Sequence, residues 1–236
     1  MNDPRGADGA DGWSRAAAVE LFVSIAALVA VMTPYARFLS WVETRPGVVL
    51  PDPVLARLVP RDLTWVTFGL IYVAIGVTVW SLRAHPRALA IGVRAYAVMV
   101  VFRALAMAVV PLDPPPGTIP LQDPLVEHLG TAGQVLTRDL FFSGHTATMS
   151  LVTLTAHGRR LRWVLLACTV GVATCVVWQA VHYTVDVVVA PAFAYAAYRI
   201  SVLATAAVRR RLGATPAGTA RAEGARPSAA KDTVRI

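Results

Sequence analysis

The chain has 236 residues, of which 56% are hydrophobic and only 15% are charged, and its formal net charge is +8 at pH 7. A soluble domain of this length needs a more strongly charged surface, so the composition excludes an ordinary soluble protein and indicates an integral membrane protein. The positive charge does not indicate a nucleic-acid partner, because most of it comes from the tail 209–236.

Six segments are apolar enough for a spanning helix, which takes about 20 mostly apolar residues. In chain order they are 16–36, 64–82, 88–110, 140–156, 163–181 and about 184–206. The first is interpreted as an uncleaved helix, because Pro34, Tyr35 and Arg37 follow it where a signal peptide would have a small-residue cleavage site. The sequence therefore predicts an all-α protein, a six-helix transmembrane bundle over 16–208, between a segment 1–15 and a tail 209–236.

The basic residues predict the orientation of this bundle. The short connection 157–162 contains Arg159, Arg160 and Arg162, whereas the connection around residue 182 contains no basic residue. Because cytoplasmic loops are enriched in Lys and Arg, we expect a multi-pass protein of the cell membrane with both termini in the cytosol. The tail lacks apolar periodicity and is predicted to be disordered, with its arginines facing anionic lipids of the inner leaflet.

The fourth segment begins with "DLFFSGHTAT", residues 139–148, which places ionisable groups where the chain enters the membrane. Such groups are costly in lipid and need a partner or a function. Ser143 is predicted to cap the helix, leaving the amides of Gly144, His145 and Thr146 at the positive end of its dipole. This arrangement favours an anion, and Gly144 lets a phosphate approach the backbone closely.

A second polar cluster, "VHYTVD", occupies residues 181–186 before the last segment. If the helix starts by residue 182, His182 and Asp186 lie on one face at i and i+4. The carboxylate then orients the imidazole and leaves its other nitrogen free to attack or to accept a proton. Both clusters lie at outer helix ends, so we expect them at the same depth.

Other interpretations of these residues remain open. Each motif alone is compatible with an ordinary helix start or a helix-surface pair, and His145, His182 and Asp186 together could ligate zinc. Cys168 and Cys175 are separated by about 10 Å along one helix, too far for a disulfide, and are interpreted as small core residues. The combination of two histidines, a carboxylate and a helix terminus favours catalysis without a metal.

The pair "DLFFSGHTAT" and "HYTVDVVVA" resembles the signature of the sphingomyelin synthase-like branch of the type 2 phosphatidic acid phosphatase superfamily. "FRALAMAVVPLDPPPG", residues 102–117, is similar to the arginine-bearing third helix of that family and the proline-rich loop after it. The resemblance covers roughly 60–205 and implies six membrane helices, no cofactor, and an active site on the extracytoplasmic face.

The resemblance also implies roles for single residues. His182 would be the nucleophile that forms a phosphohistidine, Asp186 would orient it, and His145 would be the general acid. Asp139 matches an aspartate of the family motif and would tune His145 or contact a head group.

The sequence departs from the classical lipid phosphatases, which have a Ser-Arg pair where this chain has Cys175 and Val176. Arg103, about 12 Å below the outer face, is the candidate to bind the phosphate in place of that arginine. A structural ion pair or a side chain that snorkels to the interface is the alternative for Arg103. The long loop 113–138, which includes Glu127 and His128, is interpreted as a lid on the membrane surface.

The sequence thus predicts a membrane enzyme that transfers a phosphoryl or phospho-head group between a phospholipid and a lipid alcohol. Hydrolysis of a lipid phosphate by water is the alternative within the same superfamily. A non-catalytic lipid-binding or transport protein is the alternative from another class.

Overall fold

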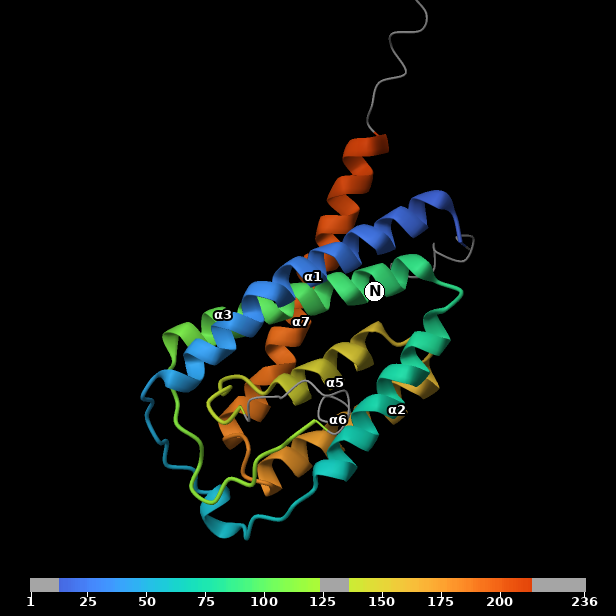
Figure 1. Cartoon of the computed structure of the whole chain (residues 1–236). Coiled ribbons are helices and arrows are strands. Elements are labelled where there is room, and N and C mark those ends of the chain that lie inside the picture. Colours follow the sequence, from blue (N-terminus) through green and yellow to red (C-terminus); the bar gives the residue numbers. More distant parts are fainter. Residues whose placement is uncertain (1–12, 124–135, 214–236) are drawn as a thin grey trace, which may run out of the picture. The chain divides into compact units, whose positions relative to one another are not determined.

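The computed structural model describes residues 13–123 and 136–213. Glu127 and His128, most of the segment 1–15 and the tail beyond residue 213 therefore lie outside the described residues. The helices are α1 (Arg15–Thr44), α2 (Thr64–Leu82), α3 (Pro86–Val109), α5 (Gly144–Thr155), α6 (Arg159–Trp178) and α7 (Thr184–Gly213), with a 3-10 turn, η1 (Leu55–Arg57), between α1 and α2 (Figure 1).

The predicted all-α architecture is confirmed for the described residues, and five of their helices are long and apolar enough to cross a membrane. The exception is α5, the predicted fourth span, which has 12 residues. At 1.5 Å per residue such a helix is about 18 Å long, against about 30 Å for the hydrocarbon core. The predicted span 140–156 was too long because residues 140–142 form a loop before Ser143, which caps the helix.

Helix α5 lies between two groups of packed side chains. On one side, Met149 packs with Phe68 of α2 and Val172 of α6. On the other side, Ala147 packs with residues of α3 and α7, including Ala95 and Ala190. The alanines bring the helix backbones close together, so the start of α5 is held inside the protein rather than at its surface.

Two compact units divide the chain, and all of the packing above belongs to the first, which ends at Val202. Within it, α1 packs along α3, as Figure 1 shows. An ion pair joins these two helices, with Arg94 Nη2 2.8 Å from Glu20 Oε1. The pair gives each charge a partner inside the predicted membrane spans. Of the second unit, only the end of α7 is described.

All six tryptophans are exposed and lie at or near helix ends, in two sets of three: Trp13, Trp80 and Trp163, and Trp41, Trp65 and Trp178. Contacts between connections place the first set at one end. Trp13 donates a hydrogen bond to the Arg83 carbonyl after α2, and His85 stacks on His157 before α6, with ring centroids 4.6 Å apart. At the other end, Trp178 Nε1 donates to the Val59 carbonyl before α2.

Exposed tryptophans at both ends of apolar helices are typical of the two interfaces of a membrane. The arginines of the connection 157–162 lie at the end that holds Trp13, Trp80 and Trp163. Both histidine motifs lie at the opposite end. The arrangement agrees with the predicted grouping of charges, and the assignment of the two ends to cytosol and exterior stays a prediction.

Candidate functional site

The candidate site begins with the cap of α5. Ser143 is its N-cap residue as predicted, and its Oγ accepts a hydrogen bond from the Thr146 N–H at 3.3 Å. The Ser143 N–H in turn donates to the Asp186 carbonyl of α7 at 3.1 Å. This backbone bond joins the two polar motifs, which lie about forty residues apart in the sequence, and fixes them at the same depth.

His182 and Asp186 form a pair, but by a different geometry from the predicted one. Helix α7 begins at Thr184, so the expectation of a helical start by residue 182 is wrong. Instead, Asp186 reaches back as a capping side chain: its Oδ2 accepts the Tyr183 N–H at 3.2 Å and lies 3.5 Å from His182 Nδ1. Both side chains are buried, with 3% and 0% exposed.

At 3.5 Å the contact is an ion pair rather than a hydrogen bond, and His182 Nδ1 has no hydrogen-bond partner among the described residues. Because Asp186 is fixed by the cap, it constrains the orientation of His182. The carboxylate faces Nδ1, so Nε2 is the nitrogen of His182 left for chemistry.

The second histidine faces the first. The ring centroids of His145 and His182 are 5.9 Å apart and the planes make an angle of 60°. The edge of Phe68 packs against His145, with centroids 5.8 Å apart, and holds it from the side of α2. His145 Nδ1 is buried and has no hydrogen-bond partner among the described residues. The site therefore presents two imidazoles to one another. Among the described residues, His182 has a carboxylate within 4 Å, that of Asp186, whereas His145 shares the cavity lining with Asp139 and Asp123.

Arg103 of α3 lies directly beside the start of α5. Its side chain is buried, and it donates to the Tyr35 hydroxyl at 3.0 Å, to the Phe142 carbonyl, and to the Asp139 carbonyl at 2.7 Å. Its Nη2 also lies 2.7 Å from Asp139 Oδ1. Four of its five N–H groups are thus engaged within the protein. Arg103 orders the loop before α5, and one N–H on Nη1 is left for a ligand.

Asp139 is ionised in this setting and faces the site. Partial burial by itself raises the pKa of Asp139, but the Arg103 guanidinium outweighs this, and His182 and His145 contribute in the same direction. The pKa of Asp139 is therefore lower than usual. Its charge stabilises the fold at neutral pH, and this contribution is lost only as the pH falls below about 4, the ordinary value.

A cavity of about 310 Å³ extends from these residues into the helices. Its polar end is lined by Arg103, Asp139, Gly144 and His145. His182 is not among the lining residues. The other lining residues include six apolar side chains of α1, α2 and α3, namely Met32, Phe68, Ile71, Ile75, Met99 and Val100, together with Tyr35, Tyr72, Tyr96, Asp123 and Thr148. A ligand with a charged head and an apolar tail matches this division.

Three side chains that support the site were not singled out from the sequence. Tyr35 holds Arg103, and Asp52 accepts from the first amide of α7, that of Thr184, at 2.7 Å. Gln179 is fully buried and accepts the Leu63 N–H at 3.0 Å, which fixes the segment before His182. Asp52 belongs to the sequence "PDP", which predicts a turn. The sequence does not indicate that the partner of Asp52 is Thr184 of α7.

Two other predictions concern the surroundings of the site. In the described residues, no three His, Cys, Asp or Glu side chains are grouped as metal ligands would be. Of the predicted lid 113–138, the described part packs over the connection between α6 and α7, where the Ile119 N–H donates to the Gln179 carbonyl at 3.2 Å. Residues 124–135 of that loop lie outside the described part.

The contact between Gly144 and Arg103 leads to a test. A Cβ on Gly144 would lie 2.8 Å from Arg103 Cζ and Nη1, closer than side chains pack, and the guanidinium is held in place by Tyr35 and Asp139. Gly144→Ala should therefore destabilise the protein by about 1–3 kcal/mol, as overpacking does, and lower any turnover at the site. Unfolding in detergent and an activity assay measure the two effects.

Gly76→Ala is the matched control, because a Cβ on this α2 glycine meets nothing within 4 Å. It should leave both measurements close to those of the parent protein. If the two alanine variants behave alike, Gly144 is not required for the position of Arg103.

Comparison with known families covers the part of the chain that holds most of the site. Residues 138–202 match the family model described as PAP2 superfamily C-terminal. The match includes Asp139, Ser143, His145, His182 and Asp186, whereas Arg103 lies before it. It supports the type 2 phosphatidic acid phosphatase superfamily, whose members are generally phosphatases or phosphotransferases, and does not reach the level of a branch. A search of curated proteins found no match to the chain.

Proposed function

We propose that the protein is a membrane enzyme that transfers a phosphoryl or phospho-head group of a lipid through a phosphohistidine on His182. The observation that carries this proposal is the pair of facing imidazoles, 5.9 Å apart, of which, among the described residues, His182 is the one with a carboxylate within 4 Å. A nucleophile needs an orienting group, whereas an acid that protonates a departing alcohol needs access to it. His182 has the orienting carboxylate of Asp186, and His145 lines the cavity that a substrate would enter.

The reaction would proceed in two balanced steps. In the first, the free Nε2 of His182 attacks phosphorus, the bond to the leaving oxygen breaks, and His145 gives that oxygen its proton. The Nδ1–H of His182 points to Asp186, which offsets the charge on the phosphorylated imidazole. In the second step, an acceptor hydroxyl gives its proton to His145 and attacks phosphorus, which frees His182.

Three groups would hold the phosphate during these steps. The amides at the start of α5 and the positive end of its dipole favour an anion. The free N–H on Arg103 Nη1 adds a charge-assisted donor beside Gly144. Asp139, being ionised, keeps the Arg103 guanidinium in place rather than contacting the phosphate itself.

The shape of the cavity supports a lipid as substrate. Its polar end is at His145 and its walls toward Ile75 are apolar. Phe68 and Ile75 are seven residues apart on α2, so the apolar part is about 10 Å long. This length fits part of an acyl chain.

The finer proposal is head-group transfer as in the sphingomyelin synthase-like branch, rather than hydrolysis. Val176, at the position of the phosphatase arginine, is fully buried in the packing between α2 and α6. Cys175 beside it lines a different cavity from His145. Arg103 of α3 therefore supplies the guanidinium that lines the cavity beside His145.

A two-substrate assay tests this proposal. We expect purified protein to make a new phospholipid from a phosphodiester phospholipid and a lipid alcohol, ceramide or diacylglycerol, in proportion to the alcohol added. Radiolabelled donor and thin-layer chromatography measure the product. Rapid release of free phosphate from phosphatidic acid, independent of added alcohol, would instead indicate a phosphatase, and no turnover of any lipid would favour a non-catalytic protein.

We further propose that the site faces the exterior of the cell. In a protein without Cys168 and Cys175, a cysteine at Val59, which is 78% exposed beside Trp178, should react with an impermeant thiol reagent in intact cells. A cysteine at Arg160, at the opposite end, should react only after permeabilisation. The reverse pattern would place the site in the cytosol.

A further inference from the structure

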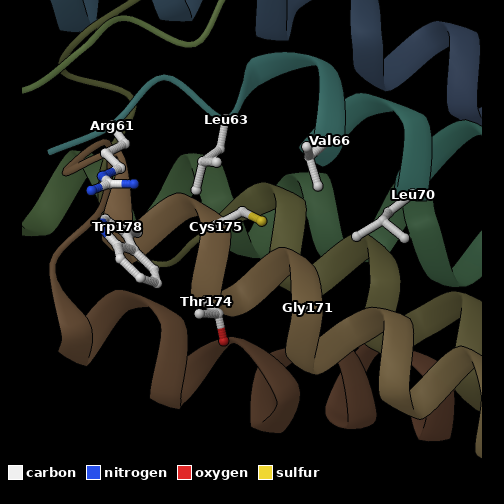
Figure 2. Close-up of a pocket in the computed structure, with 8 residues that line it drawn as sticks. All are labelled: Arg61, Leu63, Val66, Leu70, Gly171, Thr174, Cys175 and Trp178. Atoms are coloured by element: carbon white, nitrogen blue, oxygen red, sulfur yellow. The ribbon is translucent and has the colours of Figure 1, made fainter.

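A second cavity, of about 430 Å³, forms a groove on the outside of α2 and α6 (Figure 2). Val66 and Leu70 of α2 line one side, and Gly171 and Thr174 of α6 line the other. None of its lining residues also lines the first cavity, which holds Arg103 and His145. Because α2 and α6 are both candidate membrane spans, we expect the groove to face the acyl chains of the surrounding lipids.

The groove is hollow because of Gly171. A Cβ at this position would lie 3.3 Å from Leu70 Cδ1, so even alanine would close part of the space between the helices. Exposed side chains surround the groove, including Val170, which is 59% exposed, and Trp65, which is 73% exposed. Gly171 therefore leaves a local hollow in the surface of α2 and α6, which side chains cover elsewhere.

The mouth of the groove is cationic and ordered. Arg61 lies there beside Trp178, and its backbone N–H donates to the Trp178 carbonyl at 3.3 Å (Figure 2). The indole N–H of Trp178 donates to the Val59 carbonyl at 3.2 Å. The neighbouring carboxylate, Asp62, accepts the Thr64 N–H at 3.0 Å at the start of α2. Asp62 thus stabilises the start of α2, and the exposed side chain of Arg61 carries the positive charge at the mouth of the groove.

We propose that this groove binds a phospholipid, with the phosphate at Arg61 and one acyl chain along Leu70 and Gly171. The order of groups along the groove matches that of a phospholipid. The cation and the indole, which favours the interface, lie at the helix ends. Leu70 is six residues inside α2, about 9 Å deeper. The site is separate from the proposed reaction and does not depend on it.

Photocrosslinking tests the proposal with two probes that carry a diazirine midway along one acyl chain, a phosphatidylglycerol and a diacylglycerol. After illumination of the purified full-length protein, peptide mass spectrometry locates the adducts. We expect the phosphatidylglycerol probe to label peptides containing Leu70 and Gly171, and the diacylglycerol probe to label them several-fold less.

Two variants and two controls sharpen the test. Arg61→Gln should lower phosphatidylglycerol labelling of the groove about fivefold, as expected for one basic residue near the head groups, and leave diacylglycerol labelling unchanged. Gly171→Leu should remove labelling by filling the groove. Arg57→Gln and Gly76→Leu, which change the same residue types elsewhere, should have no effect on it.

Equal labelling by the two probes, or phosphatidylglycerol labelling that Arg61→Gln leaves unchanged, would overturn the proposal. The Arg61 side chain is exposed, so this variant keeps the test valid even if Gly171→Leu fails to fold. A dimer of the purified protein that shows no lipid adducts at Leu70 and Gly171 would also contradict the proposal.

Discussion

His182→Ala should abolish turnover and leave no phosphorylated enzyme. If the imidazole is the nucleophile, its removal leaves no atom to form the covalent intermediate, and the rate should fall by at least about 10³-fold. Brief incubation with labelled donor lipid, followed by denaturation, should reveal an acid-labile adduct in the parent protein and none in the variant. Mass spectrometry of the parent should locate the phosphate on His182.

The control for this variant is a histidine at the other end of the protein. His157 stacks on His85 and lies away from the site, so His157→Ala should keep both the adduct and the turnover. His182→Asn keeps a polar group beside the buried Asp186 and replaces the alanine variant if that protein is unstable. A phosphate trapped on His145 would reverse the two roles.

The sequence was informative about the site where its chemistry is local. The Ser143 cap needs only the residues of one helix start, and it was predicted correctly. The meeting of His145 with His182 followed from both motifs lying at the same end of apolar helices. Depth in a membrane is a strong constraint, because a helix that crosses it has only two ends.

The sequence was less informative where a contact joins distant segments. That Arg103 is held by Tyr35 and by the loop at Asp139 depends on how α1 packs along α3, which hydropathy does not encode. The same is true of Asp52, whose partner Thr184 is 132 residues away. Such partners fix the geometry of the site but carry no local signal of their own.

Helix α5 illustrates a third limit. Hydropathy counts apolar residues and does not distinguish a helix surrounded by lipid from one surrounded by protein. Met149 and Ala147 of α5 are fully buried among the other helices. A helix enclosed in this way can be short, because its neighbours rather than its own length separate it from water. Its shortness places its N-terminus, and hence His145, inside the protein.

Asp186 combines a local and a long-range role. Its carboxylate caps α7 through the Tyr183 N–H and faces His182 Nδ1, and its backbone carbonyl accepts from Ser143 at the other motif. Asn can replace the carboxylate in the cap, since an amide oxygen also accepts a hydrogen bond. One oxygen, Oδ2, makes both contacts, so Asn can keep their geometry, but it removes the negative charge that offsets the charge on the imidazole.

Asp186→Asn should therefore leave the fold intact and lower turnover by about 10²–10⁴-fold, the range for a group that orients a catalytic imidazole. The neutral amide no longer offsets the positive charge that develops on His182 when it attacks phosphorus, so the barrier to that step rises. The rate of phosphohistidine formation in a single turnover measures the loss of turnover, and an unfolding curve in the same detergent measures the stability of the fold.

Asp113→Asn is the matched control, because that carboxylate pairs with Arg138 at 2.7 Å and does not face the histidines. An unchanged single-turnover rate in Asp186→Asn would leave the carboxylate with its capping role alone.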